Sequence, residues 1–290
     1  MKKIKEITII GPGLIGASLG LALKKNKVVN KINGIDTNKD NIKSAIKIKA
    51  IDYDLKKIDQ KIAKSNLIIL CTPVGKFESI IRLLEPYITD NNVVTDVGSV
   101  KNIFKEKNMI LTKKKLDIVP AHPIAGTEFS GALNAKDDLF NNKWCILTPL
   151  KKSKNLKLVK FMWESVGMKV SLMSPEEHDE IMSVTSHLPH LIAFTIVSTA
   201  FNLNPKEKKR LLNFSAGGFR DFTRIGSSDP EMWKDIFLNN KKYILKTLTK
   251  FINDLGSFKS LIENDEATKI YKFIKKTKSI RKKIITLDQS

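Results

Sequence analysis

The chain has 290 residues and a mass of 32.7 kDa, a length that favours two domains over one. Lys and Arg number 51 against 30 Asp and Glu, so the formal net charge is +21, which raises nucleic acid or an anionic membrane as a partner. Hydrophobic residues make up 42% of the chain, enough for packed cores, which excludes global disorder. The excess charge is mostly Lys spread over every segment, together with many Asn and Ile. We interpret it as background composition rather than one binding face.

Cysteine content and the lengths of apolar runs indicate the compartment. Cys71 and Cys145 lie in apolar runs and are expected to be core thiols in a reducing compartment. The basic residues at the N-terminus precede only four consecutive apolar residues, which is too few for a signal peptide. The longest nearly apolar run, residues 191–201, has about half the length of a membrane span. We therefore expect a soluble, cytoplasmic protein without a membrane partner.

Residues 1–173 alternate short β-rich runs with helical patterns. This alternation predicts βαβ units, and uninterrupted apolar runs such as LIIL are typical of strands covered on both faces. We therefore predict an α/β Rossmann domain over residues 1–173, with a doubly wound, mostly parallel sheet. The strand patterns lie at residues 6–11, 31–36, 66–73, 91–99, 116–122, 143–149 and 169–173.

From residue 174 to residue 290 almost every segment has a helical pattern. Acidic residues crowd the first turn after Pro175, Pro205 and Pro230, which is typical of helix starts. We predict an all-α second domain over residues 174–290, packed closely on the first because no Gly/Ser-rich linker separates them. The helical patterns lie at residues 175–184, 190–201, 205–214, 230–255 and 265–284.

A glycine motif, Gly11-Pro12-Gly13-Leu14-Ile15-Gly16, follows the first predicted strand and opens a helix. In a dinucleotide-binding turn, Gly11 allows the tight bend, Gly13 lets the backbone approach a pyrophosphate, and Gly16 lets the helix pack against the strand. The backbone of Leu14 and Ile15 would then present the helix N-terminus to the negative charge. A tight turn without a ligand is the alternative interpretation.

Asp36 ends the second predicted strand, about twenty residues after the glycine motif. A carboxylate there accepts hydrogen bonds from a ribose 2′-hydroxyl and repels a 2′-phosphate, which favours NAD over NADP. Lys39 lies close enough in sequence to soften this preference, so NADP stays possible. Asp36 would also serve as a helix cap.

Two later strand ends carry polar residues that suit a ligand site. Thr72 and Pro73 follow one apolar run, and Ser99 follows another. Ligands of doubly wound sheets bind outside the carboxyl ends of the strands, so these residues are placed to touch cofactor or substrate. Ser99 is equally suited to cap a helix.

His122 follows the predicted strand at residues 116–122, and the chain has only four histidines. A histidine at such a strand end suits a base or hydrogen-bond partner for a hydroxyl being oxidised, because its pKa lies near working pH. A loop histidine without a role is the alternative.

Three histidines lie in the predicted helical domain. His187 and His190 have the H-x-x-H spacing of some metal sites, but no Cys cluster or acidic third ligand accompanies them, so we expect no metal. One of the two is expected to face a cleft. His178, within the acidic segment PEEHDE, is expected to be a solvated helix residue.

The segment GGFRDFTR places paired glycines before a helix that bears Arg220, Asp221 and Arg224. Arginine forms bidentate bonds with carboxylates, so Arg224 or Arg220 suits the fixing of a dianionic substrate. An Arg–Asp ion pair between two helices would be the structural alternative.

Together these motifs resemble the prephenate dehydrogenase family, including its arogenate and cyclohexadienyl variants. The resemblance extends from about residue 5 to residue 250. It is based on GPGLIGASLGLAL, the strand-end Asp36, DVGSVK, HPIAGTE, SHLPH and GGFRDFTRIGSSDPEMW, in this order. It implies an N-terminal Rossmann domain, a helical domain that dimerises, and NAD(P)-dependent oxidative decarboxylation of a cyclohexadienol in tyrosine biosynthesis.

The resemblance also implies roles for single residues. His122 of HPIAGTE matches the catalytic histidine that hydrogen-bonds the ring hydroxyl, and Ser99 of DVGSVK matches the neighbour that orients this hydroxyl. Arg224 matches the anchor of the substrate carboxylate, with His190 nearby. The positions that shape or gate the pocket are matched by Glu128, Asp221 and Trp233.

Two other functions stay open at this point. Another two-domain NAD(P)-dependent hydroxyacid or imine oxidoreductase would share the glycine motif without needing HPIAGTE or DFTR. A nucleic-acid-binding protein would use the +21 charge, but it would need clustered basic residues with base-stacking aromatics, and here the Lys residues are dispersed. The partners that we expect are a small-molecule substrate, prephenate or arogenate, and a second copy of the chain.

Overall fold

The structure is a computed structural model that describes residues 3–105, 116–127, 129–150, 153–202, 210 and 213–285. It divides into two compact units, residues 1–240 and 241–290. The predicted helix at residues 205–214 lies mostly outside the described residues, and so does the predicted site residue Glu128.

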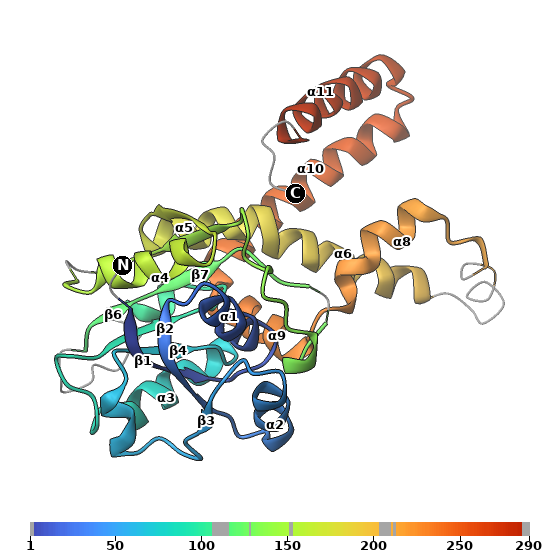
Figure 1. Cartoon of the computed structure of the whole chain (residues 1–290). Coiled ribbons are helices and arrows are strands. Elements are labelled where there is room, and N and C mark those ends of the chain that lie inside the picture. Colours follow the sequence, from blue (N-terminus) through green and yellow to red (C-terminus); the bar gives the residue numbers. More distant parts are fainter. Residues whose placement is uncertain are drawn as a thin grey trace. The chain divides into compact units, whose positions relative to one another are not determined.

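Six parallel strands form the first sheet, in the order β3-β2-β1-β4-β5-β6 (Figure 1). The strand order reverses between β1 and β4, which makes the carboxyl ends of these two strands the topological switch point where such sheets bind ligands. The predicted Rossmann fold is therefore confirmed. The strands are β1 (Ile4–Ile10), β2 (Val29–Ile35), β3 (Tyr53–Asp54), β4 (Leu67–Leu70), β5 (Val93–Asp96) and β6 (Ile118–Val119).

Both faces of this sheet are covered, as the apolar strands predict. All four residues of β4 are buried, and alternate ones enter different cores. Ile69 packs in the cluster that contains Leu19 of α1, whereas Ile68 and Leu70 pack in the cluster that contains Phe77 of α3. The helices that follow the first strands are α1 (Leu14–Lys25), α2 (Lys39–Lys47) and α3 (Phe77–Leu84).

A second, three-stranded sheet begins where the chain leaves the first one at Pro120. The predicted strand at 116–122 is split, because Pro120 has no N–H to donate to a ladder. Its carbonyl accepts a hydrogen bond from the Thr148 amide at 3.0 Å, and the next residues join the new sheet. This switch places His122 opposite Ile146, on a different sheet from β5, the strand that Ser99 follows. The new sheet contains β7 (Ala121–Pro123), antiparallel to β8 (Trp144–Leu147), which is parallel to β9 (Lys169–Leu172) and precedes α4 (Leu156–Ser165).

The remainder of the first unit is helical, and its helices start as predicted. Ser174 caps the first one, with its hydroxyl accepting from the Glu177 amide at 3.1 Å and Pro175 in the first turn. Asp229 caps the last one through the Met232 amide at 2.8 Å. These elements are α5 (Pro175–Met182), η5 (Ser183–His187), α6 (Leu188–Phe201), α8 (Gly217–Thr223), η6 (Arg224–Ser227) and α9 (Pro230–Asn239).

The helix that we expected to begin after Pro189 instead continues from α5 through the π-helical turn η5. Proline lacks the N–H that would bond the carbonyl four residues earlier, and its ring crowds that carbonyl, so the turn before Pro189 widens rather than breaking. The widened turn carries His187 into the protein interior.

By length and composition alone, the described residues include one stretch that is long and apolar enough to cross a membrane, Pro175–Phe201. Its first half nevertheless buries His178 and Asp179 inside the protein, as a core helix does. In its second half, α6, Ala193 is the one buried residue. Most other apolar residues of α6 are half-buried, and Ile196 is its exposed large apolar side chain.

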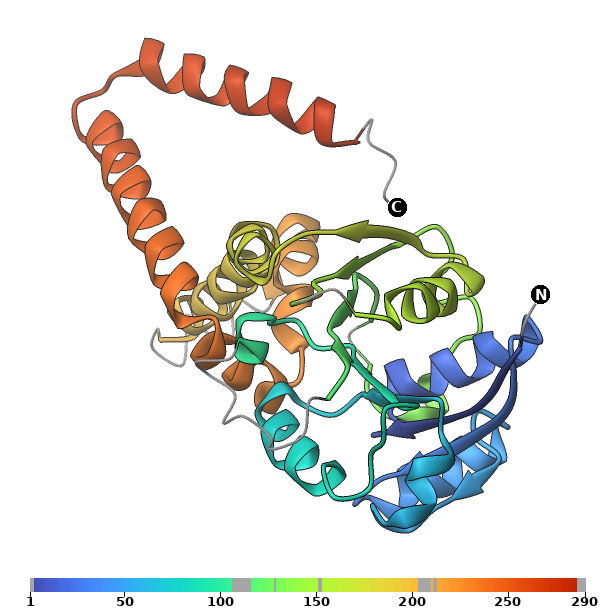
Figure 2. The ribbon, with the colours of Figure 1, turned by 90° about the vertical axis from the view of Figure 1, so that its left-hand side faces the viewer.

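The predicted helix at 230–255 is interrupted at Asn240, where α9 ends. Asn240 is buried, and its side chain bonds other elements of the first unit. The second compact unit is a helical pair, α10 (Lys241–Glu263) and α11 (Ala267–Ile285) (Figure 2). The Phe258 and Phe273 rings pack between these two helices, with centroids 5.1 Å apart. Besides η6, the described residues include the short 3-10 turns η1 (Gln60–Lys64), η2 (Val74–Lys76), η3 (Asn102–Phe104) and η4 (Ala132–Asn134).

The predicted boundary between residues 173 and 174 lies between β9 and α5, inside the first compact unit. The helices α5 to α9 thus belong to the same compact unit as the two sheets. The boundary itself stays a prediction.

Candidate active site

The glycine motif forms the turn between β1 and α1, at the switch point of the sheet. Gly11 has φ +87°, a left-handed conformation that favours glycine, and a Cβ there would lie 2.9 Å from the Cys71 carbonyl oxygen. A Cβ at Gly16 would lie 2.7 Å from the Gly11 carbonyl oxygen. A Cβ at Gly13 would meet no atom within 4 Å, so open space lies beside the backbone where α1 begins.

The residues around this turn fit a dinucleotide. Leu14 and Ile15 open α1, and the N–H groups of a first helical turn have no intrahelical acceptor, so they favour an anion. Across the switch point, the hydroxyl oxygen of Thr72 is buried without a hydrogen-bond partner among the described residues. Pro73 beside it is exposed. An open anion-binding turn with an unpaired hydroxyl next to it is what a bound pyrophosphate would require.

Asp36 follows β2 and is already engaged in a local turn. One carboxylate oxygen accepts from the Asn38 amide at 2.8 Å, and the other accepts from the Asn41 side chain at 3.1 Å. The cap of α2 is Asn38, whose side chain accepts from the Asp40 and Asn41 amides, so Asp36 supports the cap residue rather than forming the cap itself. A carboxylate has about four acceptor sites, so the two bonds to Asp36 leave room for a ribose hydroxyl.

The segment after β5 is fixed by a buried ion pair. Asp96 accepts from the Gly98 amide at 2.7 Å, from the Ala121 amide at 3.0 Å, and from the ammonium group of Lys101. The Lys101 ammonium also donates to the Ala121 carbonyl at 2.6 Å. Both backbone groups of Ala121 are therefore bound to residues that flank Ser99, which ties the Ser99 segment to the start of β7. This is how the fold brings Ser99 and His122 into one neighbourhood although they follow different sheets.

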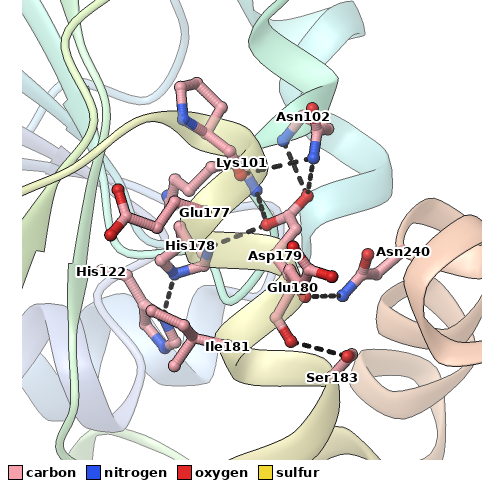
Figure 3. Close-up of polar contacts among 12 residues, drawn as sticks. Lys101, Asn102, His122, Glu177, His178, Asp179, Glu180, Ile181, Ser183 and Asn240 are labelled. Atoms are coloured by element: carbon pink, nitrogen blue, oxygen red, sulfur yellow. Dashed lines mark hydrogen bonds and ion pairs between the residues drawn. The ribbon is translucent and has the colours of Figure 1, made fainter. Parts of the chain in front are cut away.

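His122, the second residue of β7, is bonded to a second histidine. Its Nδ1 lies 2.8 Å from Nε2 of His178 on α5, and the rings meet edge to face with centroids 5.0 Å apart (Figure 3). His178 in turn bonds Asp179, with Nδ1 and a carboxylate oxygen 2.7 Å apart. Side chains from β7 and from α5 therefore form a continuous His122–His178–Asp179 chain.

Asp179 joins this chain to the segment after Ser99. Its carboxylate accepts from the Lys101 amide at 2.8 Å, from the Asn102 amide at 2.9 Å, and from the Asn102 side chain at 2.7 Å (Figure 3). Burial alone raises the pKa of Asp179, but the bonds with His178 and with these amides outweigh burial and hold the pKa below its usual value. Asp179 is thus a fixed, buried anion.

Burial keeps the histidines neutral. It lowers the pKa of His122 well below the usual 6.5, and the neighbouring His178 and Lys101 lower this pKa further. Burial also lowers the pKa of His178, although Asp179 opposes that shift. A neutral imidazole has one free lone pair, so His122 can accept a hydrogen bond or a proton at physiological pH.

His187, in the π-helical turn, lies on the other side of Asp179. Its Nδ1 accepts from the side-chain amide of Asn240 at 3.0 Å, and the same amide donates to the Asp179 carbonyl at 2.8 Å. Burial lowers the pKa of His187 to about 4, while the backbone of Ser99 beside the ring acts in the opposite direction. Asn240, which follows α9, thus bonds both α5 and the π-helical turn η5.

His190 and Trp233 form a stacked pair. Their ring centroids are 4.0 Å apart and the planes are inclined by 25°. The Nδ1–H of His190 donates to the Ser186 carbonyl at 2.9 Å, which leaves its Nε2 as an acceptor. Trp233 is buried, and its indole Nε1 has no hydrogen-bond partner among the described residues. The structure therefore brings these two predicted residues together, beside the helix that carries His187.

The predicted anionic-substrate residues lie in an exposed segment. Asp221 is exposed on α8, and Arg224 is exposed at the start of η6. Both elements pack against α6, the helix that carries His190. Their role in the site stays a prediction.

His178 corrects one expectation and reveals residues that the sequence did not. We expected a solvated residue, yet His178 is fully buried and at the centre of the cluster. The signal was the spacing of the buried residues of α5: Pro175, His178, Asp179 and Met182 recur at three- and four-residue intervals and form one helix face. Lys101 and Asn240 were missed as well, because nothing local distinguishes them from solvated residues.

No group of three or more His, Cys, Asp or Glu side chains is placed to hold a metal within the described ranges. Both thiols pack with the first core, Cys145 fully buried and Cys71 partly buried. The polar chemistry of the described site is therefore that of histidines, carboxylates and backbone amides.

Comparison with known proteins places this geometry in a family context. The chain matches the family description "Prephenate dehydrogenase, nucleotide-binding domain" over residues 19–172. It matches "Prephenate dehydrogenase, dimerization domain" over residues 174–276. Together these two matches cover most of the chain.

Individual relatives agree with this. The chain is 35% identical to a prephenate dehydrogenase of Bacillus subtilis, over 97% of this chain and 76% of the relative. It is 31% identical to a cyclohexadienyl dehydrogenase of Zymomonas mobilis, over 97% and 96%. The crystal structure of prephenate dehydrogenase from A. aeolicus, in complex with hydroxyphenyl propionate and NAD+, superposes with a TM-score of 0.90 and 37% identity, covering 98% of this chain and 99% of that one.

Proposed function

Because this chain belongs to the prephenate dehydrogenase family, we propose that it oxidises and decarboxylates prephenate or arogenate, with NAD as the hydride acceptor. The products are 4-hydroxyphenylpyruvate or tyrosine, respectively, and the reaction belongs to tyrosine biosynthesis. One observation carries the proposal: a buried, neutral histidine, His122, is fixed beside the Ser99 segment, which follows β5 of the sheet that also presents the glycine motif.

The first requirement of this reaction is a dinucleotide at the switch point. The turn from Gly11 to Gly16 and the first turn of α1 would hold the pyrophosphate, with Thr72 and Pro73 across from them. Asp36 would accept from the adenosine ribose, which favours NAD over NADP. Bound there, NAD supplies the hydride acceptor, which the protein itself lacks.

The second requirement is a base for the ring hydroxyl. The carbon that bears this hydroxyl loses hydride, the ring carboxylate leaves as carbon dioxide, and aromatisation of the ring drives the reaction. His122 accepts the hydroxyl proton at Nε2, because its Nδ1 is engaged with His178. Ser99 orients the same hydroxyl. The cluster positions the base before the substrate arrives, so little reorganisation is needed during the reaction.

The third requirement is an anchor for the substrate side-chain carboxylate. Arg224 suits this role because its guanidinium binds carboxylates in a bidentate manner. The stacked His190 and Trp233 would form a wall of the pocket, with Asp221 and Glu128 shaping its entrance. Glu128 lies outside the described residues, so its role is based on the family motif alone.

We further propose a homodimer that forms through the helical domain, residues 174–290. The helix α6 is rich in apolar residues, but most of them are only half-buried and Ile196 is exposed, whereas a helix of this composition normally packs inside a protein. A second copy of the chain would cover this surface, in agreement with the dimerization domain that residues 174–276 match. A soluble biosynthetic dimer acting in the cytoplasm is the assembly we propose.

A matrix of substrates and cofactors tests the function. We would measure NADH or NADPH formation with prephenate, with arogenate and with a small 3-hydroxyacid, each with NAD and with NADP. The proposal expects turnover with prephenate, arogenate or both, faster with NAD. Turnover of the 3-hydroxyacid alone would contradict it and indicate a different two-domain dehydrogenase.

The molar mass in solution tests the dimer. Light scattering coupled to gel filtration should give about twice 32.7 kDa. A monomer at micromolar concentration would contradict the dimer while leaving the proposed reaction intact.

A further inference from the structure

The direction of each hydrogen bond in the His122–His178–Asp179 chain follows from its last member. A carboxylate without its proton is only an acceptor, and both Asp179 oxygens already face backbone or amide N–H groups. The bond of 2.7 Å between Asp179 and Nδ1 of His178 therefore requires the proton on Nδ1 of His178.

The proton position on His178 then determines the proton position on His122. A neutral imidazole carries one N–H, so a proton on Nδ1 of His178 leaves its Nε2 as an acceptor. That Nε2 lies 2.8 Å from Nδ1 of His122, which must be the donor. The lone pair of His122 is consequently on Nε2, the nitrogen that makes no bond to the cluster.

We propose that Asp179, acting through His178, is a positioning residue that selects the Nδ1–H tautomer of His122 and so keeps its Nε2 ready to accept the substrate hydroxyl proton. In the step itself, the substrate O–H bond breaks and an N–H bond forms at Nε2 of His122. The positive charge that develops on His122 is then shared along the chain toward the buried carboxylate. This inference rests on the proposed function for the role of the tautomer, but the tautomer itself is a property of the protein without substrate.

If Asp179 had only a structural role, the proton position on His122 would not depend on it. Its bonds to the Lys101 and Asn102 amides already hold α5 to the segment after β5, and they would do so whatever the state of the two rings. A structural role therefore predicts no particular proton position on His122. The tautomer separates the two roles.

Two other histidines provide internal references. His190 donates from Nδ1 to a carbonyl, so it should also carry its proton on Nδ1. His187 accepts at Nδ1 from the Asn240 amide, so it should carry its proton on Nε2. Because the chain has only four histidines, the structure predicts three Nδ1–H rings and one Nε2–H ring.

Nitrogen NMR of the full-length protein labelled with ¹⁵N-histidine measures these tautomers directly, because protonated and unprotonated ring nitrogens have well-separated shifts. The spectrum would be recorded with saturating NAD and without substrate, near neutral pH. Each signal is assigned by its loss in a single histidine variant. We expect the Nδ1–H form for His122 and His178 and the Nε2–H form for His187.

Two substitutions at His178 test the transmission. His178→Gln keeps an acceptor, the amide oxygen, for the Nδ1–H of His122, whereas His178→Phe keeps the ring shape and removes the acceptor. We expect His122 to keep the Nδ1–H form in the Gln variant and to lose it in the Phe variant. The expected fall in kcat is about 10- to 100-fold for Phe and clearly smaller for Gln, with the NAD dissociation constant unchanged in both.

Two results would overturn the inference. One is an Nε2–H form of His122 in the wild-type spectrum, which needs no variant to be observed. The other is an unchanged Nδ1–H form in His178→Phe. Absence of turnover with prephenate and arogenate in the wild type would instead reject the proposed function, and the tautomers would stand as measured.

Discussion

The buried histidine cluster and the exposed arginine segment differ in how firmly the protein holds them. His122, His178 and Asp179 are nearly or fully buried, and each ring and carboxylate has a named partner. The segment from Gly217 to Ser227, which carries Arg224, contains no buried residue among those described. The proposed base thus lies in the core, whereas the proposed carboxylate anchor lies at the surface.

This difference has a physical reason. A base works only when its tautomer and its neutral state are set in advance, and both are set by burial and fixed hydrogen bonds. An anchor for a carboxylate must stay hydrated and charged until the substrate arrives, and an exposed arginine does so without a desolvation cost. Changes in the two regions should therefore affect different kinetic constants.

The largest effect is expected from His122→Asn. Loss of the base should lower kcat by about 10²- to 10⁴-fold, whereas the NAD dissociation constant should not change because the glycine turn is untouched. Steady-state rates and an NAD titration by fluorescence measure the two quantities. Wild-type turnover in this variant would show that His122 is not the catalytic base, and the buried cluster would then not differ from the exposed arginine segment in the way proposed.

Arg224→Gln should act mainly on the substrate KM. Loss of a charged hydrogen-bonded contact should raise the substrate KM by about 10- to 1000-fold with a smaller change in kcat. Arg220→Gln, in the adjoining exposed helix α8 and with the same loss of charge, is the matched control and should change KM far less. Equal rises in KM for the two substitutions would mean that positive charge in this segment attracts the substrate in general, and that Arg224 is not a specific anchor.

The burial of the histidine cluster should appear in the pH dependence of stability. The pKa of His187 is about 4 in the folded protein and about 6.5 when unfolded, so between these values the unfolded state binds more protons. Protonation of His187 in the unfolded state therefore lowers the free energy of unfolding as pH falls from 6.5 toward 4. The loss from this residue is about 3 kcal/mol.

Urea unfolding at a series of pH values measures this slope. His187→Asn should flatten the slope between pH 6.5 and 4, although it also weakens the protein at neutral pH through the lost contact with Asn240. His190→Asn, at a half-buried position, is the control and should change the slope less. An unchanged slope in the His187 variant would show that this ring is not kept neutral by burial.

The smallest effect is expected from Gly13→Ala in the glycine turn. The added Cβ meets no protein atom within 4 Å, so the melting temperature without NAD should not change. The same Cβ occupies the space beside the proposed pyrophosphate, so the NAD dissociation constant should rise about tenfold, equivalent to about 1.4 kcal/mol. Gly256→Ala, also without neighbours within 4 Å but on α10, should leave NAD binding unchanged. Unaltered binding by Gly13→Ala would place the cofactor elsewhere.

The fold was predictable because its signals are local. The apolar run of β4, the glycine turn and the strand-end Asp36 each depend on a few neighbouring residues, and together they specify a doubly wound sheet. The switch of sheets at Pro120 and the π-helical turn before Pro189 were not predictable in this way. A proline marks a break in a pattern, but tertiary packing decides whether the chain then changes sheet, widens a turn or stops.

The candidate site was predictable only in part for a similar reason. Ser99 follows β5, and His122 ends the predicted strand at 116–122, so predicted strand ends indicated both residues, although the structure places His122 within β7 of the second sheet. His178 and Asp179 lie in an acid-rich helix start that is typical of solvated surfaces, and only their spacing from Pro175 and Met182 indicated a buried face. Lys101 is one of 51 basic residues, and its pairing with Asp96 becomes visible only when the strands are assembled.

The pH dependence of kcat/KM tests the central claim most directly, because it reports the protonation state of the free enzyme's base. A protonated His122 cannot accept the substrate proton, so activity is lost as pH falls through the pKa of this residue. The buried cluster holds that pKa well below 6.5. We therefore predict that kcat/KM with NAD and the preferred substrate stays level as pH falls through 6.5 and declines only at lower pH. A decline centred at or above pH 6.5 would contradict the account, because it would describe a solvated histidine rather than one kept neutral in the core.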